Sequence, residues 1–166
     1  MNIVLVGMSG AGKSTIGVLL AKSLGMDFVD TDLVIQRREG RLLQEIIDQD
    51  GIDAFMEIEE DVVSDLRLTQ CIIATGGSVI YSDRAMNALK QGGRVIYLHV
   101  PYEEIARRLT TIATRGIVMK NGNSLQDVYN ERVPLYLKHS DRTIDCTEKD
   151  IEQCVQEIKI EWLTNA

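Results

Sequence analysis

Eight residues near the N-terminus combine glycines, a lysine and a serine in an order that suits phosphate binding. Residues 7–14 read G-M-S-G-A-G-K-S and match the pattern G-x-x-x-x-G-K-[ST]. In such a loop the backbone N–H groups face phosphate oxygens, the lysine reaches the β- and γ-phosphates, and the hydroxyl ligates Mg²⁺. We therefore expect ATP to be held by Gly10, Ala11, Gly12, Lys13, Ser14 and Thr15, with Ser14 at Mg²⁺. The alternative is a glycine-rich turn with an incidental lysine.

The elements around this loop agree with phosphate binding. Residues 2–6 form a short apolar run that predicts a buried strand. Residues 13–24 carry apolar side chains at helical spacing, and Gly25 is a plausible stop. The loop is therefore predicted between a strand and a helix, as its mechanism requires.

Strands and helices alternate along the rest of the chain. Further short apolar runs predict strands at 26–29, 71–75, 94–100 and 143–146. Helical patterns cover 33–66, with interruptions near Gly40 and Gly51, and then 84–91, 103–109, 125–139 and 150–163. Because the strands are continuously apolar rather than alternating, we expect an α/β fold of three layers, with a parallel sheet of about five strands covered by helices on both faces.

Length and composition limit the organisation and the partners. The chain has 166 residues, which favours one domain over 1–166, and its net charge of −7 disfavours binding to nucleic acid or an anionic membrane. Three cysteines without C-x-x-C spacing support neither a disulfide framework nor a zinc site. No apolar run approaches the roughly 20 residues that span a bilayer. We expect a cytoplasmic monomer.

The remaining sequence distinguishes among proteins with such a loop. A GTPase switch would carry N-K-x-D, which is absent. A motor ATPase would be longer and would end an apolar strand in D-E, whereas the strand at 71–75 runs into Gly76, Gly77 and Ser78. A small-molecule kinase fits the length best.

Five motifs in register make the chain resemble the shikimate kinases, small P-loop kinases that phosphorylate a ring hydroxyl of a cyclohexene carboxylic acid. The motifs are G-M-S-G-A-G-K-S-T-I-G at 7–17, F-V-D-T-D at 28–32, A-T-G-G-S at 74–78, R-V-I-Y-L at 94–98 and R-V-P-L-Y at 132–136. The resemblance implies the P-loop kinase fold, ATP and Mg²⁺, a small helical substrate subdomain over 33–66, and a lid over 110–124.

The resemblance also implies roles for acidic residues and glycines on the acceptor side. Asp30 would lie near Mg²⁺, whereas Asp32 would bind substrate hydroxyls and orient or deprotonate the attacking one. Both aspartates follow a strand end, where open α/β sheets place ligands, although helix capping is the competing interpretation. Gly76 and Gly77 would form the substrate turn.

Three arginines complete the site that the resemblance implies. Arg132 would pair with the substrate carboxylate, Arg115 in the lid would close over the transferring phosphate, and Arg108 would lie against adenine. For Arg115 the alternative is a solvated loop residue, and for Arg108 a surface helix residue.

The sequence departs from the family around the substrate. Met56 stands where the family has a second carboxylate-binding arginine, Ser78 replaces a third glycine, and the lid reads R-G-I-V where R-P-L-L is common. We expect an ATP-dependent kinase with shikimate as the leading acceptor. Two alternatives stay open: a paralogous kinase for another small alcohol, such as a sugar acid or a nucleoside, and a regulatory nucleotide-binding protein without phosphotransfer.

Overall fold

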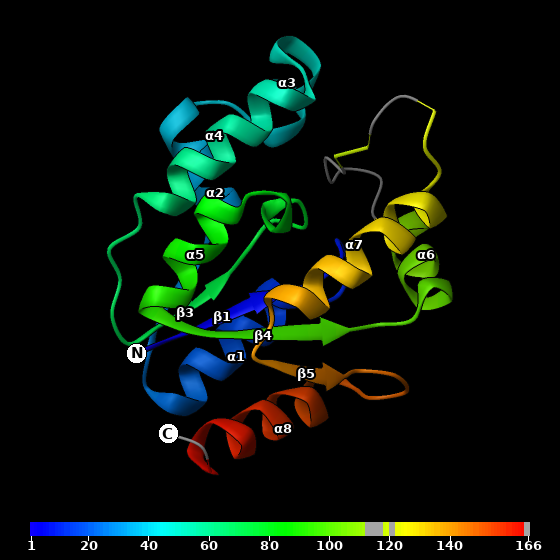
Figure 1. Ribbon diagram of the computed structural model, residues 1–166. Helices are drawn as coiled ribbons and strands as arrows, with labels where there is room; N and C mark the ends of the chain where they lie inside the picture. Colours follow the sequence, from blue (N-terminus) through cyan, green and yellow to red (C-terminus); the bar gives the residue numbers. More distant parts are fainter. Residues whose placement is uncertain (112–117, 120–121, 165–166) are drawn as a thin grey trace.

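Five parallel strands form the centre of the structure (Figure 1), a computed structural model that describes residues 1–111, 118–119 and 122–164. The strands are β1 (Asn2–Val6), β2 (Asp27–Asp30), β3 (Cys71–Ala74), β4 (Gly93–His99) and β5 (Arg142–Asp145). Their order in the sheet is β2-β3-β1-β4-β5, and every neighbouring pair is parallel. The predicted parallel sheet of about five strands is confirmed.

The central strand explains why the sequence forms a parallel sheet. All five residues of β1 are buried, and Val4 lies opposite Ile73 on one side and Val95 on the other. Apolar side chains therefore extend from both faces of the strand, and a layer of helices must cover each face. Because all the strands run in one direction, their carboxyl ends lie at one edge of the sheet.

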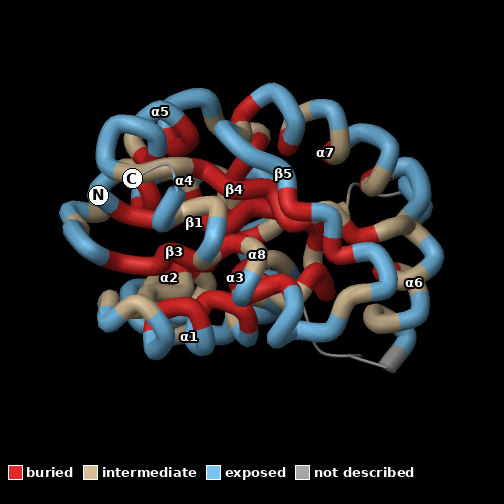
Figure 2. The backbone as a smooth tube through the Cα atoms, turned by 90° about the horizontal axis from the view of Figure 1, so that it is seen from below, coloured by how far each residue is buried: buried red, intermediate tan, exposed pale blue. Residues whose placement is uncertain are grey.

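Helices cover the two faces of the sheet (Figure 2). On one face lie α1 (Lys13–Leu24) and α8 (Ile151–Thr164), and on the other lie α5 (Asp83–Gly92) and α7 (Leu125–His139). Helix α6 (Tyr102–Thr111) follows β4 and contacts α7. The three-layer arrangement predicted from the sequence is confirmed.

Three short helices form the region predicted as the substrate subdomain. They are α2 (Thr31–Glu39), α3 (Leu43–Asp50) and α4 (Ile52–Ser64), and they contain a hydrophobic cluster of their own around Ile35, Ile46 and Phe55. The breaks fall at Gly40 and Gly51, as predicted. The first helix begins two residues earlier than the predicted residue 33, because Asp30 caps it.

The segment predicted as a lid, 110–124, is described only in part. Helix α6 continues to Thr111, so the first two residues of the segment are helical rather than loop. Arg115 lies outside the described residues. Val118 is buried against the cluster of the three short helices. The short 3₁₀ helix η1 (Val79–Tyr81), which follows the glycine turn, was not predicted.

Candidate active site

The phosphate loop connects β1 to α1 at the carboxyl edge of the sheet. Gly12 precedes the helix with φ 93°, a conformation that favours glycine, so its position in the motif has a backbone cause. Lys13 begins the helix, and its buried ammonium donates hydrogen bonds to the carbonyls of Gly7 (2.7 Å) and Met8 (2.9 Å). The lysine charge therefore lies at the loop itself, beside the helix N-terminus.

Ser14 and Asp30 come together from different elements. The Ser14 hydroxyl donates to Asp30 Oδ2 at 2.6 Å, and Asp30 Oδ1 accepts from the backbone N–H of Asp32 at 3.0 Å. The capping interpretation of Asp30 is therefore correct, and it does not exclude a role at a metal, because the same carboxylate contacts the hydroxyl of the phosphate loop. Asp32 lies in the first turn of α2.

A cleft of about 380 Å³ joins the phosphate loop to the acceptor side. Its wall contains Ser9, Gly10, Gly12, Lys13, Ser14, Asp30, Asp32, Gln36, Thr75, Gly76 and Gly77, among others. Most of the residues predicted for phosphate, metal and substrate therefore share one cavity, although they come from three separate parts of the sequence.

The glycine turn after β3 is fixed by its neighbours on both sides. The N–H of Gly76 donates to Thr31 Oγ1 at 3.1 Å, and the Gly77 carbonyl accepts from the Tyr136 hydroxyl at 2.6 Å. Thr75 is tied to the end of β1 through its hydroxyl, which donates to the Leu5 carbonyl. These hydrogen bonds connect the turn to α2 and α7, in the wall of the cleft.

Arg132 projects from α7 toward this turn. Its side chain is buried, with Nη2 donating to the Val118 carbonyl at 2.7 Å and Nε to the Tyr81 hydroxyl at 3.3 Å. A Cβ placed on Gly77 would lie 2.8 Å from Arg132 Nη1, so the glycine admits the guanidinium. Arg132 lines a small cavity together with Asp32, which puts a cation and a carboxylate on its wall.

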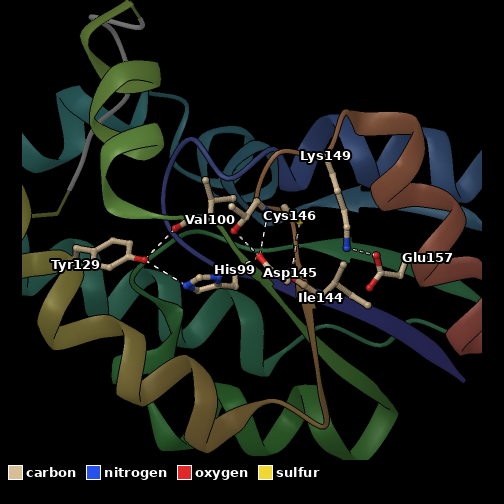
Figure 3. A network of polar contacts seen from close by, with 9 residues as sticks. His99, Val100, Tyr129, Ile144, Asp145, Cys146, Lys149 and Glu157 are labelled. Atoms are coloured by element: carbon tan, nitrogen blue, oxygen red, sulfur yellow. Dashed lines mark hydrogen bonds and ion pairs between the residues drawn. The ribbon is translucent and has the colours of Figure 1, made fainter.

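Polar contacts at the strand ends hold α7 in place (Figure 3). The Tyr129 hydroxyl, one turn before Arg132, donates to the Val100 carbonyl at 3.0 Å and lies 3.5 Å from His99 Nε2. His99 Nδ1 in turn lies 3.5 Å from Asp145 Oδ1, at the end of β5. These contacts link α7 to β4 and β5, and so position the helix that carries Arg132.

A second cavity, of about 350 Å³, lies on the other side of the phosphate loop. Its wall includes Gly10, Ala11, Gly12, Thr15, Glu104, Arg108 and Lys149. Arg108 donates through Nη1 to the Gly10 carbonyl at 3.0 Å and through Nε to Glu104 Oε1 at 2.7 Å. Its guanidinium is therefore directed at the loop by Glu104, whose pKa is lowered to about 2 by hydrogen bonds from Arg107 and Arg108.

Glu59, to which the sequence motifs assigned no role, is a buried carboxyl at the acceptor side. Glu59 lines the small cavity with Asp32 and Arg132, and its Oε2 accepts a hydrogen bond from the Ser78 hydroxyl at 2.5 Å. A signal was available, because Phe55 and Val62 define the buried face of α4 and Glu59 lies on it at helical spacing. Met56, by contrast, packs against the apolar cluster of the three short helices.

The oxygen donors beside the phosphate loop suit Mg²⁺. This ion is typically bound through one or two carboxylates together with substrate phosphates. The Ser14 hydroxyl and the Asp30 carboxylate lie together in the wall of the cleft, next to the loop. Within the described residues no cluster of three or more His, Cys, Asp or Glu side chains forms a protein-only metal site.

No helix in the described part of the chain has the length and apolarity to cross a membrane.

Comparisons with known proteins agree with this geometry. A family model described as shikimate kinase matches residues 9–163. The shikimate kinase of Pseudomonas paraeruginosa is 39% identical over 161 residues, covering 95% of this chain and 94% of that protein.

Two solved structures match nearly the whole chain. The shikimate kinase from Acinetobacter baumannii in complex with shikimate superposes with a TM-score of 0.89 at 32% identity, over 99% of this chain and 93% of that one. The shikimate kinase from Aquifex aeolicus gives a TM-score of 0.83 at 30% identity, over 99% and 98%. With a phosphate loop, an acceptor cleft and these matches in agreement, the chain belongs to the shikimate kinase family.

Proposed function

We propose that this chain transfers the γ-phosphoryl group of ATP to a ring hydroxyl of shikimate. The observation that carries the proposal is the shared cleft, in which the phosphate loop meets Asp32 and the Gly76–Gly77 turn. Transfer between two bound molecules depends chiefly on positioning and on stabilisation of charge. A single cavity lined by both sets of residues supplies the positioning.

On the nucleotide side, the loop and Lys13 hold the phosphates. The ammonium of Lys13 lies at the start of α1, where it can follow charge that develops on the transferring group. Ala11 and Thr15 line the second cavity, where Arg108 would lie against the base. Mg²⁺ held by Ser14 and Asp30 would neutralise phosphate charge when bound.

On the acceptor side, Asp32 and Arg132 would bind different groups of the substrate. The Asp32 carboxylate would accept a hydrogen bond from the attacking hydroxyl and take its proton during transfer. The buried Arg132 guanidinium would pair with the ring carboxylate, behind the Gly77 turn. The proposal also includes Arg115 as a lid residue that closes over the transferring phosphate.

A coupled assay that measures ADP release tests the function. Shikimate should support turnover with MgATP, whereas sugar acids, nucleosides and neutral polyols should not. Turnover with one of those compounds in place of shikimate would establish a kinase for another alcohol. If no acceptor increases ADP release although ATP binds tightly, the chain is a regulatory nucleotide-binding protein without phosphotransfer.

The proposal includes a cytoplasmic monomer that binds no nucleic acid. The net charge of −7 supports the last point, because phosphate backbones repel an acidic protein. Light scattering coupled to size-exclusion chromatography would determine the oligomeric state.

A further inference from the structure

Glu59 is a buried acidic residue with an unused hydrogen-bonding atom. Only 2% of its surface is exposed, and its Oε1 has no hydrogen-bond partner in the part of the chain that the structure describes. A Cβ placed on Gly76 would collide with this oxygen and would lie 3.0 Å from Asp32 Oδ1. The free oxygen is therefore next to the substrate turn, on the side of Asp32.

The surroundings of this oxygen form a small polar cavity. The cavity measures about 20 Å³ and is lined by Ser9, Asp32, Glu59, Ser78 and Arg132 together with apolar residues. That volume is enough for about one water-sized group. A buried acceptor without a partner is costly, so a hydroxyl that enters the cavity would be bound by it.

The other oxygen of Glu59 is held by Ser78. Its Oε2 accepts from the Ser78 hydroxyl at 2.5 Å, which connects α4 to the glycine turn. Position 56 lies three residues before Glu59 on the same helix, where a side chain can reach it, but Met56 offers no donor. The hydroxyl of Ser78 is therefore the direct partner that orients the carboxyl.

We infer that Ser78 is a positioning residue, which orients Glu59 so that Oε1 accepts a hydrogen bond from a ring hydroxyl of the acceptor. The inference rests on the proposed function for the identity of that acceptor. It adds Glu59 to Asp32 as a second carboxyl that recognises hydroxyl groups. In this chain the Ser78 hydroxyl makes the contact with Glu59 that a cationic side chain at position 56 could make instead.

The charges around Glu59 agree with a carboxyl that titrates near neutral pH. Burial, the largest influence, raises the pKa of Glu59 to about 7, and Asp32 on α2 raises it further. The Ser78 hydrogen bond, Arg132 on α7 and Lys13 on α1 act in the opposite direction. Because an ionised carboxylate is the better acceptor, a substrate hydroxyl should be bound more tightly as pH rises through this range.

The first test follows the Glu59 carboxyl by ¹³C NMR in the protein without substrate, with the resonance assigned by Glu59→Gln. Ser78→Ala should shift the titration midpoint to higher pH, because it removes a donor to the charged form. Met56→Arg should shift the midpoint to lower pH, because it adds a cation within reach. Alanine suits position 78, where φ is −91° and ψ is −11°. Unmoved midpoints in both variants would overturn the inference.

The second test measures shikimate binding by calorimetry from pH 5.5 to 8.5. Ser78→Ala should raise the Kd for shikimate about fivefold or more at pH 7, and its Kd should reach the low plateau only at higher pH than in the parent. The KM for ATP should stay the same. If Ser78→Ala moves the Glu59 titration midpoint but leaves the Kd for shikimate unchanged, then Oε1 does not bind the acceptor, and that part of the inference is overturned.

Ser82→Ala is the matched control. The Ser82 hydroxyl donates to Glu60 Oε2, which is a second serine–glutamate contact between α4 and the following segment, and it caps α5 outside the cavity. This variant should lose thermal stability and leave both the Glu59 midpoint and the shikimate Kd unchanged. If the parent does not bind shikimate but the midpoints move as expected, the proposed function fails and the Ser78–Glu59 pairing stands.

Discussion

The ammonium of Lys13 contacts the carbonyls of Gly7 and Met8 rather than the hydrophobic core. Replacing the side chain therefore removes a charge from the phosphate loop with little loss of packing. We expect Lys13→Ala to lower kcat by about 10²- to 10³-fold, the usual effect of losing one stabilising donor. The midpoint of thermal unfolding should change by only a few degrees. The coupled assay and a melting curve check both, and near-normal turnover would contradict the assigned role of Lys13.

Asp30 performs two tasks that one substitution can separate. It caps α2 through Oδ1 and contacts Ser14 through Oδ2. Asparagine caps helices about as well as aspartate but carries no charge. Asp30→Asn should therefore keep the unfolding free energy within about 0.5 kcal/mol of the parent, while the Mg²⁺ concentration for half-maximal activity rises severalfold. A magnesium titration measures this, and an unchanged requirement would argue against Asp30 as a ligand.

The residue types could be predicted where a motif fixes them locally. The loop from Gly7 to Ser14 depends on its own backbone, so its pattern was sufficient to identify it. The spacing of Phe55 and Val62 places Glu59 on the buried face of α4, but its hydrogen bond with Ser78 on the glycine turn does not follow from its neighbours in sequence. The role of Glu59 was missed because its hydrogen-bond partner is set by the tertiary fold.

At the scale of elements, helix α4 offers a position from which to alter the acceptor pocket. Met56 is partly buried against the apolar cluster of the short helices, one turn before Glu59. An arginine there can lay its stem along the apolar surface and extend its guanidinium toward the pocket. We expect Met56→Arg to lower the KM for shikimate by roughly tenfold, which corresponds to about 1.4 kcal/mol.

The same substitution distinguishes a pocket that binds shikimate from one that binds an acceptor without a carboxylate. If the acceptor has no carboxylate, the added cation would gain no partner from the substrate, and turnover of the true acceptor would fall. Steady-state kinetics of the parent and the variant, with shikimate and with neutral polyols, decide between these outcomes.

Helix α6 presents Arg108 to the phosphate loop through a pair of charge-assisted contacts. Glu104 accepts from the Nε of both Arg107 and Arg108, one turn further along the helix. Glu104→Gln should weaken this arrangement, so that the KM for ATP rises about threefold while the KM for shikimate stays the same. Arg108→Lys should raise the KM for ATP at least as much, because lysine keeps the charge and loses the planar fork. Equal changes in both KM values would indicate a general disturbance of the fold instead.

At the scale of the whole molecule, the sheet was the most predictable feature. The central strands β1 and β3 are short, apolar and buried on both faces, a pattern that favours a parallel sheet, whereas the edge strand β5 buries only Ile144. Boundaries were less predictable. Asp30 shortens the connection to α2 by capping it, and α6 extends to Thr111 through residues that carry no strong apolar period. Capping and long-range packing determine such limits, and a single sequence shows them only in part.

The pH dependence of the whole molecule has an acidic limb from exposed carboxylates. Hydrogen bonds from Arg107 and Arg108 lower the pKa of Glu104 to about 2, and contacts from Thr147 lower the pKa of Asp145 to about 2. In both cases the folded pKa is below the unfolded value, so their contribution to stability is present at neutral pH and is lost as pH falls toward 2.

Glu59 acts in the opposite sense. Burial raises its pKa from 4.5 to about 7, so the folded chain binds more protons than the unfolded chain between these values. The free energy of unfolding must therefore fall as pH rises through this window. A glutamine at this position keeps an acceptor for Ser78 and does not titrate.

We accordingly expect Glu59→Gln to gain stability relative to the parent as pH increases. The difference in unfolding free energy should change by about 3 kcal/mol in favour of the variant between pH 4.5 and pH 8, since one pKa unit corresponds to about 1.4 kcal/mol. Urea titrations of both proteins at several pH values measure it, with Glu57→Gln as a control that removes an exposed carboxylate from the same helix. A difference that stays constant across this range would mean that Glu59 keeps its charge throughout, held by Ser78 and Arg132 despite its burial.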